Sequence, residues 1–167
     1  MNLEDDDDFD FNDDMSEEER DAFERKYNED RKRQKNHPLF LQANEVLHIV
    51  SVIAENILDE EKDMYGSAMM ESAMVIPAKI AGAMSSESWL LSMQNAAIIR
   101  HHAEYLLTST NGLKIFTKTD KDYIKLLREE MIRFKSLFNE WVKEIHAIPE
   151  EEFVDDWGLF IRNKFSS

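Results

Sequence analysis

The sequence predicts an all-α fold, because turn-forming residues are rare and helix-forming residues recur at helical spacing. The 167-residue chain contains only four glycines and three prolines. Leu, Met, Ala, Glu and Lys recur at intervals of three and four residues, the spacing of one face of a helix. We therefore expect an antiparallel up-down four-helix bundle with an extra polar N-terminal helix and a disordered acidic tail.

The charge distribution divides the chain into segments of different character. Residues 1–19 contain eleven acidic and no basic residues, whereas residues 20–35 contain four acidic and seven basic residues. The acidic residues in 1–19 predict a disordered segment, and they argue against generic nucleic-acid binding. The predicted organisation is an acidic tail over 1–15, a polar helix over 16–36, a four-helix bundle over 37–149 and an aromatic C-terminal tail over 150–167.

Capping residues and an apolar stripe define the first two predicted helices. Ser16 and Glu19 have the spacing of a capping box, and Asn36, His37 and Pro38 end the polar helix. The next helix is predicted from about residue 39 to residue 58, with one apolar stripe facing the core. The stripe comprises Leu39, Ala43, Val46, Val50, Ile53 and Ile57.

The segment 67–84, SAMMESAMVIPAKIAGAM, is predicted to be a closely packed inner helix. Small residues let neighbouring backbones approach, and methionine fills irregular gaps. Pro77 lies within it, and proline has no amide hydrogen to donate to the preceding turn. We expect the helix to bend there and the carbonyl of Ala73 to lose its intrahelical partner.

The last two predicted helices are separated by the longest break in the apolar pattern. The third bundle helix is expected to begin at Ser85 or Ser86 and to extend to about Leu107. A break is predicted over 108–120, with Asn111-Gly112 as a turn and Asp120 as the cap of the final helix. The apolar face of that final helix comprises Tyr123, Leu127, Met131, Phe134, Phe138, Trp141, Ile145 and Ile148.

The predicted helices carry more apolar surface than a single bundle can cover. The segment 86–107 is apolar nearly all round, which is typical of a helix covered on several sides. At 100° per residue, part of the apolar surface of the helix over 39–58 also falls outside its main stripe. We therefore predict a homo-oligomer. The candidate interface residues are Leu41, Ile49, Val52, Met70, Met74, Ile98 and Tyr105.

The segment around Pro77 resembles the second-helix signature of small four-helix bundle proteins encoded in bacterial ribosomal RNA intervening sequences. That signature reads S-Q-[LM]-R-R-A-A-V-S-I-P-S-N-I-A-E-G, and a Tyr-Gly pair, here Tyr65 and Gly66, precedes it. Length and helix order agree over about residues 38–146. The matching signature positions are Ala73, Ile76, Pro77, Ile80 and Ala81.

This resemblance implies a bundle that assembles as a ring of five copies. It also implies an alternative role as an RNA-binding accessory subunit, because the retroelement accessory variability determinant in this group binds RNA and its reverse transcriptase. Met70 and Glu71 stand where the family has two arginines, and Gly82 and Ala83 replace a Glu-Gly pair. Cations that would contact phosphates are missing at that position, so a nucleic-acid partner is disfavoured.

Candidate metal sites are each incomplete in the sequence. Glu45 and His48 have the E-x-x-H spacing of di-iron bundles, but the pair occurs once. His101 and His102 are about 100° apart on a helix, which makes a shared ion unfavourable. A calcium loop would use Asp8, Asp10, Asn12, Met15 and Glu19, but Asp13 stands where the loop requires glycine. We predict no metal and no cofactor.

No arrangement of catalytic residues can be placed in the sequence, so we predict a non-enzymatic scaffold or adaptor with protein partners. Phe9 and Phe11, set between carboxylates, form a candidate motif for docking on a basic, apolar groove. Solubilisation, or pairing of the tail with a basic protein, are the alternatives. The chain has no cysteine, no signal-peptide pattern and no apolar run long enough to span a membrane, so a cytoplasmic location is expected.

Overall fold

The computed structural model describes residues 16–57, 65–86 and 88–148, and every regular element within these ranges is a helix. The helices are α1 (Glu17–Lys35), α2 (Pro38–Asn56), α4 (Ser67–Met84), α5 (Trp89–Phe116) and α6 (Lys121–His146). The predicted all-α class is confirmed for this part of the chain. The acidic and aromatic tails, including Phe9, Phe11 and all of the candidate calcium loop except Glu19, lie outside the described residues.

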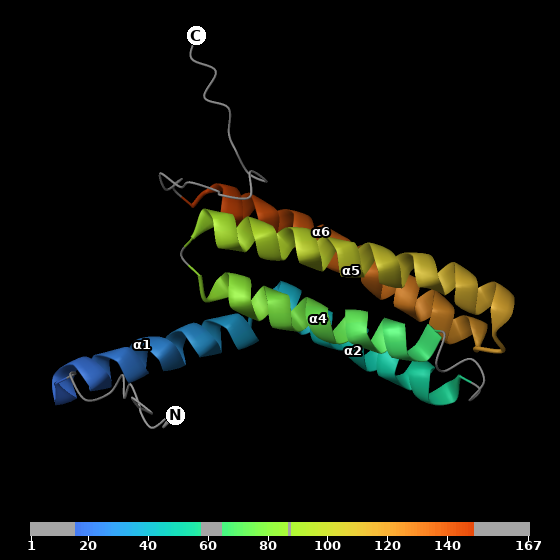
Figure 1. Cartoon of the computed structure of the whole chain (residues 1–167), viewed down its shortest axis with the longest axis horizontal. Coiled ribbons are helices and arrows are strands. Elements are labelled where there is room, and N and C mark those ends of the chain that lie inside the picture. The colour runs from blue at the N-terminus through green and yellow to red at the C-terminus, as the bar shows by residue number, and fades with distance from the viewer. Residues whose placement is uncertain (1–15, 58–64, 87, 149–167) are drawn as a thin grey trace, which may run out of the picture.

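Four of the helices pack together, and the fifth stands apart. Figure 1 shows α2, α4, α5 and α6 side by side, with α1 projecting from one end of the group. Among these four, α2 packs on α4 and α6, and α5 packs on α4 and α6. Helix α1 contacts α2 only where the two meet, and none of its residues is buried. Among the described helices, none combines the length and the apolar character needed to cross a membrane.

The junction between α1 and α2 follows the signals in the sequence. The Ser16 hydroxyl accepts the amide of Glu19, and the Glu19 carboxylate accepts the amide of Ser16, which completes the capping box. Asn36 ends α1, and His37 is the N-cap of α2 with Pro38 in the first turn. Proline suits that position because its missing amide would have no helical partner there.

The hydrophobic core lies between α2, α4, α5 and α6. All six residues of the predicted α2 stripe are buried, as are Leu127, Met131, Phe134, Trp141 and Ile145 on α6. Tyr123 departs from the prediction because its side chain is 39% exposed, and Ile124 enters the core in its place. A tyrosine at a helix start can keep its hydroxyl in water, whereas isoleucine has no polar atom to hydrate.

Helix α4 continues through Pro77, so the proline does not end it. The carbonyl of Ala73 would accept a hydrogen bond from the amide of residue 77, but proline has no amide hydrogen. Ala73 is fully buried, and Pro77 is buried as well. Neighbouring helices cover this weak point, which is where a helix with a missing hydrogen bond needs tertiary support.

The start of α5 differs from the sequence prediction. Ser85 is the C-cap of α4, and the N-cap of α5 is Ser88, whose hydroxyl accepts the amide of Leu91 at 3.4 Å. The hydroxyl of Ser86 accepts the amide of Ser88 at 3.1 Å and so stabilises the connection. Serine recurs several times in this stretch, and packing of α4 decides which copy caps the next helix.

The predicted break is wrong over 108–116, because α5 continues through Asn111-Gly112 to Phe116, and only residues 117–120 separate α5 from α6. The hydroxyls of Thr108 and Thr110 donate to carbonyls of their own helix and so do not compete with it. Leu113 is fully buried in the core, and the ring of Tyr65 covers Gly112. Tertiary packing therefore overrides the local turn signal. Asp120 caps α6 as predicted, its carboxylate accepting the amide of Asp122 at 2.9 Å.

The two glycines in α4 and α5 provide a test of this packing. A Cβ on Gly112 would lie 2.9 Å from Cε1 of Tyr65, whereas a Cβ on Gly82 would meet no atom within 4 Å. We expect Gly82→Ala to raise the free energy of unfolding by about 1 kcal/mol through helix propensity. Gly112→Ala should gain the same free energy of unfolding through helix propensity but lose about 1–3 kcal/mol of it through overpacking against Tyr65. Urea denaturation measures both, and a Gly112→Ala variant as stable as Gly82→Ala contradicts the close approach of Tyr65.

Candidate functional site

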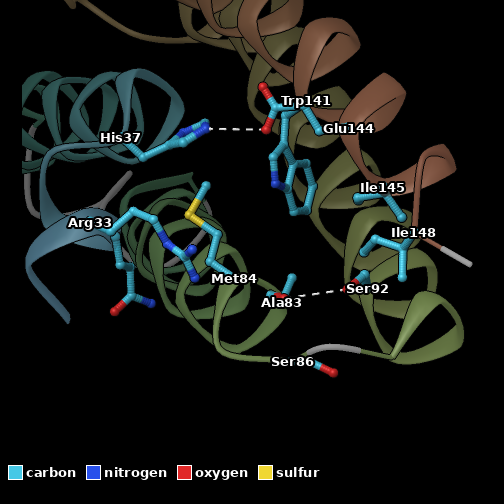
Figure 2. A pocket seen from close by; sticks show the side chains of 11 residues that line it. Arg33, His37, Ala83, Met84, Ser86, Ser92, Trp141, Glu144, Ile145 and Ile148 are labelled. Atoms are coloured by element: carbon cyan, nitrogen blue, oxygen red, sulfur yellow. Dashed lines mark hydrogen bonds and ion pairs between the residues drawn. The ribbon is translucent and has the colours of Figure 1, made fainter. Parts of the chain in front are cut away.

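One cleft lies where the ends of α1, α4 and α6 meet, and we call it the α1/α4/α6 cleft. Its volume is about 680 Å³. Figure 2 shows Met84 and Trp141 on opposite sides of it, with His37 and Glu144 at one edge. Its lining combines a cation, an apolar floor and a carboxylate: Arg33, His37, Met84, Trp141, Glu144 and Ile148 are among its residues.

His37 has a fixed orientation at the edge of this cleft. Its Nδ1 accepts the amide of Leu39 at 3.2 Å, so in the neutral ring the hydrogen is carried by Nε2. Nε2 lies 3.7 Å from a carboxylate oxygen of Glu144, which is an ion-pair distance only when the ring is protonated. Glu144 is mostly exposed, so this contact is weak. The pair links the N-cap of α2 to the end of α6.

A second cleft of about 550 Å³ runs along α1 beside the end of α4, and we call it the α1/α4 cleft. Phe23 and Tyr27 line it, with their ring centroids 6.5 Å apart in a stacked arrangement. Their side chains are 62% and 56% exposed. Aromatic rings this exposed on a helix with no buried residue are available for contact with another segment or molecule.

Two polar contacts set the register between α4 and α5. Nδ1 of His102 lies 3.1 Å from the hydroxyl of Ser72, and the hydroxyl of Ser92 donates to the carbonyl of Ala83 at 3.3 Å. The two helices therefore run antiparallel here. Burial lowers the pKa of His102, the neighbouring His101 lowers it further, and Glu71 opposes both effects. His102 is consequently held in its neutral form close to Ser72.

The candidate interface residues do not share one face. On α5, Ile98 and Tyr105 lie four residues before and three residues after His102, so they share its side of the helix. On α4, Met70 and Met74 are each two residues from Ser72, which turns them about 200° away from α5. Leu41 and Val52 lie on a third face, on α2, which they share with Glu45.

Exposure also separates these candidates. Leu41, Met74 and Ile98 are 56%, 54% and 37% exposed. Ile49 is 4% exposed and belongs to the core of its own chain, so it is closed to a second copy. The remaining three candidates, Val52, Met70 and Tyr105, are partly buried. Of these, Met70 and Tyr105 pack against the core.

A third cleft, the α5/α6 groove, has an apolar floor and charged edges. Its volume is about 400 Å³. Ala103, Leu107, Phe134 and Phe138 contribute to the floor. Arg100 and Glu104 form an ion pair of 2.9 Å along α5 at one edge, with both side chains largely exposed.

Glu130 carries a buried carboxylate that sequence reasoning missed. It is 8% exposed between α2 and α6, and it accepts a hydrogen bond from the amide of Gln42 at 2.8 Å. The same amide lies 3.2 Å from the backbone carbonyl of Glu130, and Arg133 pairs with the carboxylate at 3.0 Å. Its position between Leu127 and Phe134 on the apolar face of α6 is a signal that could have identified it.

The histidine and carboxylate pairs do not form a metal centre. Glu45 and His48 are exposed on α2, and the rings of His101 and His102 meet edge to face at 5.3 Å. Among the described residues, no three His, Cys, Asp or Glu side chains come close enough to hold one metal ion. What the described surface offers chemically is therefore apolar clefts with charged rims, which suit binding of other chain segments.

Comparisons with known proteins give no relative on which to base a function. No family model, no curated protein and no solved structure matches this chain. The resemblance around Pro77 therefore remains a sequence-based prediction, and the function has to be argued from the surfaces described above.

Removing the Glu130 carboxylate tests the polar link between α2 and α6. We expect Glu130→Ala to lower the free energy of unfolding by about 1–3 kcal/mol, because the amide of Gln42 loses its acceptor in a partly buried site. Glu130→Gln keeps an acceptor and should lose less. Urea denaturation of Gln42→Ala, Glu130→Ala and the double variant gives the coupling between them. Strictly additive losses would show that the two side chains do not interact.

Acidification tests the environment of His102. Because its pKa in the folded protein lies below the ordinary 6.5, the unfolded chain binds this proton more readily. The stabilising contribution is complete above pH 6.5 and is lost as the pH falls toward the folded-state pKa. We expect His102→Gln to weaken the pH dependence of unfolding below pH 6.5. Identical pH profiles for the parent protein and His102→Gln would rule this out.

Proposed function

We propose that this chain is a non-enzymatic scaffold or adaptor whose α2, α4, α5 and α6 form an antiparallel up-down bundle that assembles with copies of itself. Each of these four helices packs on two of the others, which supports the bundle. The polar contacts between α4 and α5 and the Gln42–Glu130 bond between α2 and α6 are compatible with antiparallel neighbours. Such bundles use their outer helix faces for assembly.

A stripe of apolar side chains on α5 is the observation that carries this proposal. Leu91, Ile98 and Tyr105 are spaced by seven residues, so they lie one above another on the same face. Leu91 and Ile98 are 49% and 37% exposed. We call these three residues the α5 stripe. Leu91 was absent from the sequence-based candidates, and heptad spacing from Ile98 is the signal that identifies it.

The α5 stripe is also free of charged residues, which favours contact between identical copies. The residues between its members on that face are Gln94, Asn95, His101 and His102. Residues 36–167 contain twenty acidic and thirteen basic residues, so faces that carry these carboxylates would repel a second copy. Interface centres are depleted in charge and enriched in aromatic residues, a composition that the stripe shares. A self-complementary contact along α5 thus avoids the repulsion that other faces would meet.

An RNA-binding accessory role is the second candidate, and the basic end of α1 is what favours it. Arg31, Lys32 and Lys35 make no ion pair with another described residue. Phosphate binding by these cations would weaken steeply as salt is raised, because binding releases counterions. A gel-shift titration with a short single-stranded RNA at low and moderate salt separates the two functions. A scaffold shows no shift at either salt concentration.

Placing a charge on the α5 stripe tests assembly directly. We expect the parent protein to have a solution mass of several times 19.7 kDa by light scattering. Ile98→Glu should reduce the mass to that of one chain. Burying an unpaired carboxylate between two copies costs more free energy than the apolar contact at this position contributes. Ile132→Glu is the matched control, since Ile132 is 66% exposed on α6 and lies between polar neighbours along its helix.

Circular dichroism of both variants is the folding control: if the helical signal is retained, a change in mass reports assembly alone. A parent protein that is monomeric at micromolar concentration would refute the proposal. The location of the interface would be wrong if Ile132→Glu dissociated the assembly and Ile98→Glu did not.

A further inference from the structure

The two clefts beside α1 adjoin each other. Gln34 and Met84 line both the α1/α4/α6 cleft and the α1/α4 cleft. The combined groove runs from Trp141 at the end of α6, across Met84, to Phe23 near the start of α1. Three aromatic side chains and a methionine thus line a channel that no other described segment fills, and we call it the α1 groove.

The last described residue after α6 lies in the wall of this groove. Ile148 lines the α1/α4/α6 cleft, and Figure 2 shows it beside Ile145 on the same side of the cleft as Trp141. Pro149 follows, and a proline cannot continue the hydrogen-bond pattern of α6. Residues 149–167 are therefore tethered to the groove through Ile148. Their short tether gives them a high effective concentration there compared with any free partner.

We propose that residues 150–161 of the same chain bind in the α1 groove as an amphipathic helix antiparallel to α1. Phe153, Trp157 and Phe160 have the i, i+4, i+7 spacing that places three side chains on one helix face. A proline followed by three glutamates, at residues 149–152, is a helix-start signal. Residues 150–161 and the groove wall from Phe23 to Gln34 are equal in number, each about 18 Å long as a helix.

Charge complementarity sets the antiparallel direction. The first seven residues of the segment include five acidic ones, Glu150, Glu151, Glu152, Asp155 and Asp156. In the antiparallel arrangement they lie beside the basic last turn of α1, which contains Lys32, Arg33 and Lys35. Asp30 already pairs with Arg33 at 3.0 Å, but Arg31 and Lys32 have no such partner among the described residues.

The residues that follow the segment continue the match. Arg162 and Lys164 follow residue 161, and the first turn of α1 contains Glu17, Glu18 and Glu19. A parallel arrangement would instead place acidic residues of the segment beside these glutamates. Like charges in contact are unfavourable, so the two opposite-charge matches select one direction. The aromatic face of the segment then covers Phe23 and Tyr27, which the described chain leaves exposed.

Disulfide trapping in the full-length chain tests this arrangement, because the protein has no cysteine of its own. Ser85 lines the α1/α4 cleft, and Gly158 follows Trp157 in the segment. We expect the Ser85→Cys, Gly158→Cys double variant to form an intrachain disulfide about tenfold faster than a Ser136→Cys, Gly158→Cys control, because docking raises the local thiol concentration. Ser136 is exposed on α6, away from the groove.

Equal rates of disulfide formation in the two double variants would overturn the proposal. A bond that forms mainly between chains, identified by non-reducing electrophoresis, would also overturn it, because the occupant would then belong to a second copy. Retention of helical circular dichroism in both variants shows that the comparison is made on folded protein.

A charge reversal provides an independent test in the same cysteine background. Arg31→Glu with Arg33→Glu should slow the intrachain disulfide several-fold, and adding Glu151→Arg with Glu152→Arg should restore the rate. Restoration by the second pair of substitutions shows contact between the two segments rather than general damage to α1. If the rate is unchanged by the first pair or is not restored by the second, the proposed direction of the segment is wrong.

Discussion

The buried polar contacts between helices are the constraint on which the rest of the described structure depends. Burial of apolar surface drives the four packed helices together, but it is non-directional and allows many sliding registers. The Gln42–Glu130 bond fixes α2 against α6, and the Ser72–His102 contact fixes α4 against α5. Each would lose a hydrogen bond if the helices slid by one turn, and an unsatisfied buried polar group is costly. The clefts and the α5 stripe are positioned by the registers that these contacts select.

Helix α1 owes its position to a different constraint, which is the turn at His37 and Pro38. The cap of α2 redirects the chain, so α1 leaves the group of packed helices with no buried residue of its own. A helix without a buried face gains little from packing and relies on capping and charge pairs. Its exposed aromatic pair therefore stands out as a surface that needs an occupant. The two proposals use different surfaces, since copies would meet along α5 while the C-terminal segment would lie along α1.

The sequence predicted the buried faces of the helices better than the functional surfaces. The stripe of α2 and most of the α6 face were read correctly, because a long amphipathic helix has one arrangement that hides its apolar side. The candidate interface residues fall on three helix faces in the structure, and Ile49 lies in the core. Which faces become neighbours depends on the order of packing around the core, and single-helix periodicity carries no information about it.

The sequence by itself determined the helical class, the helix caps at Ser16 and Asp120, and the buried stripe of α2, since these depend on residues close together in the chain. Only the tertiary structure decided that α5 continues through Asn111-Gly112, because the covering ring of Tyr65 and the burial of Leu113 come from distant contacts. It likewise decided that Glu130 is buried, as its partner Gln42 lies on another helix. Local signals set where a helix can begin or end, and long-range packing sets which of those signals are used.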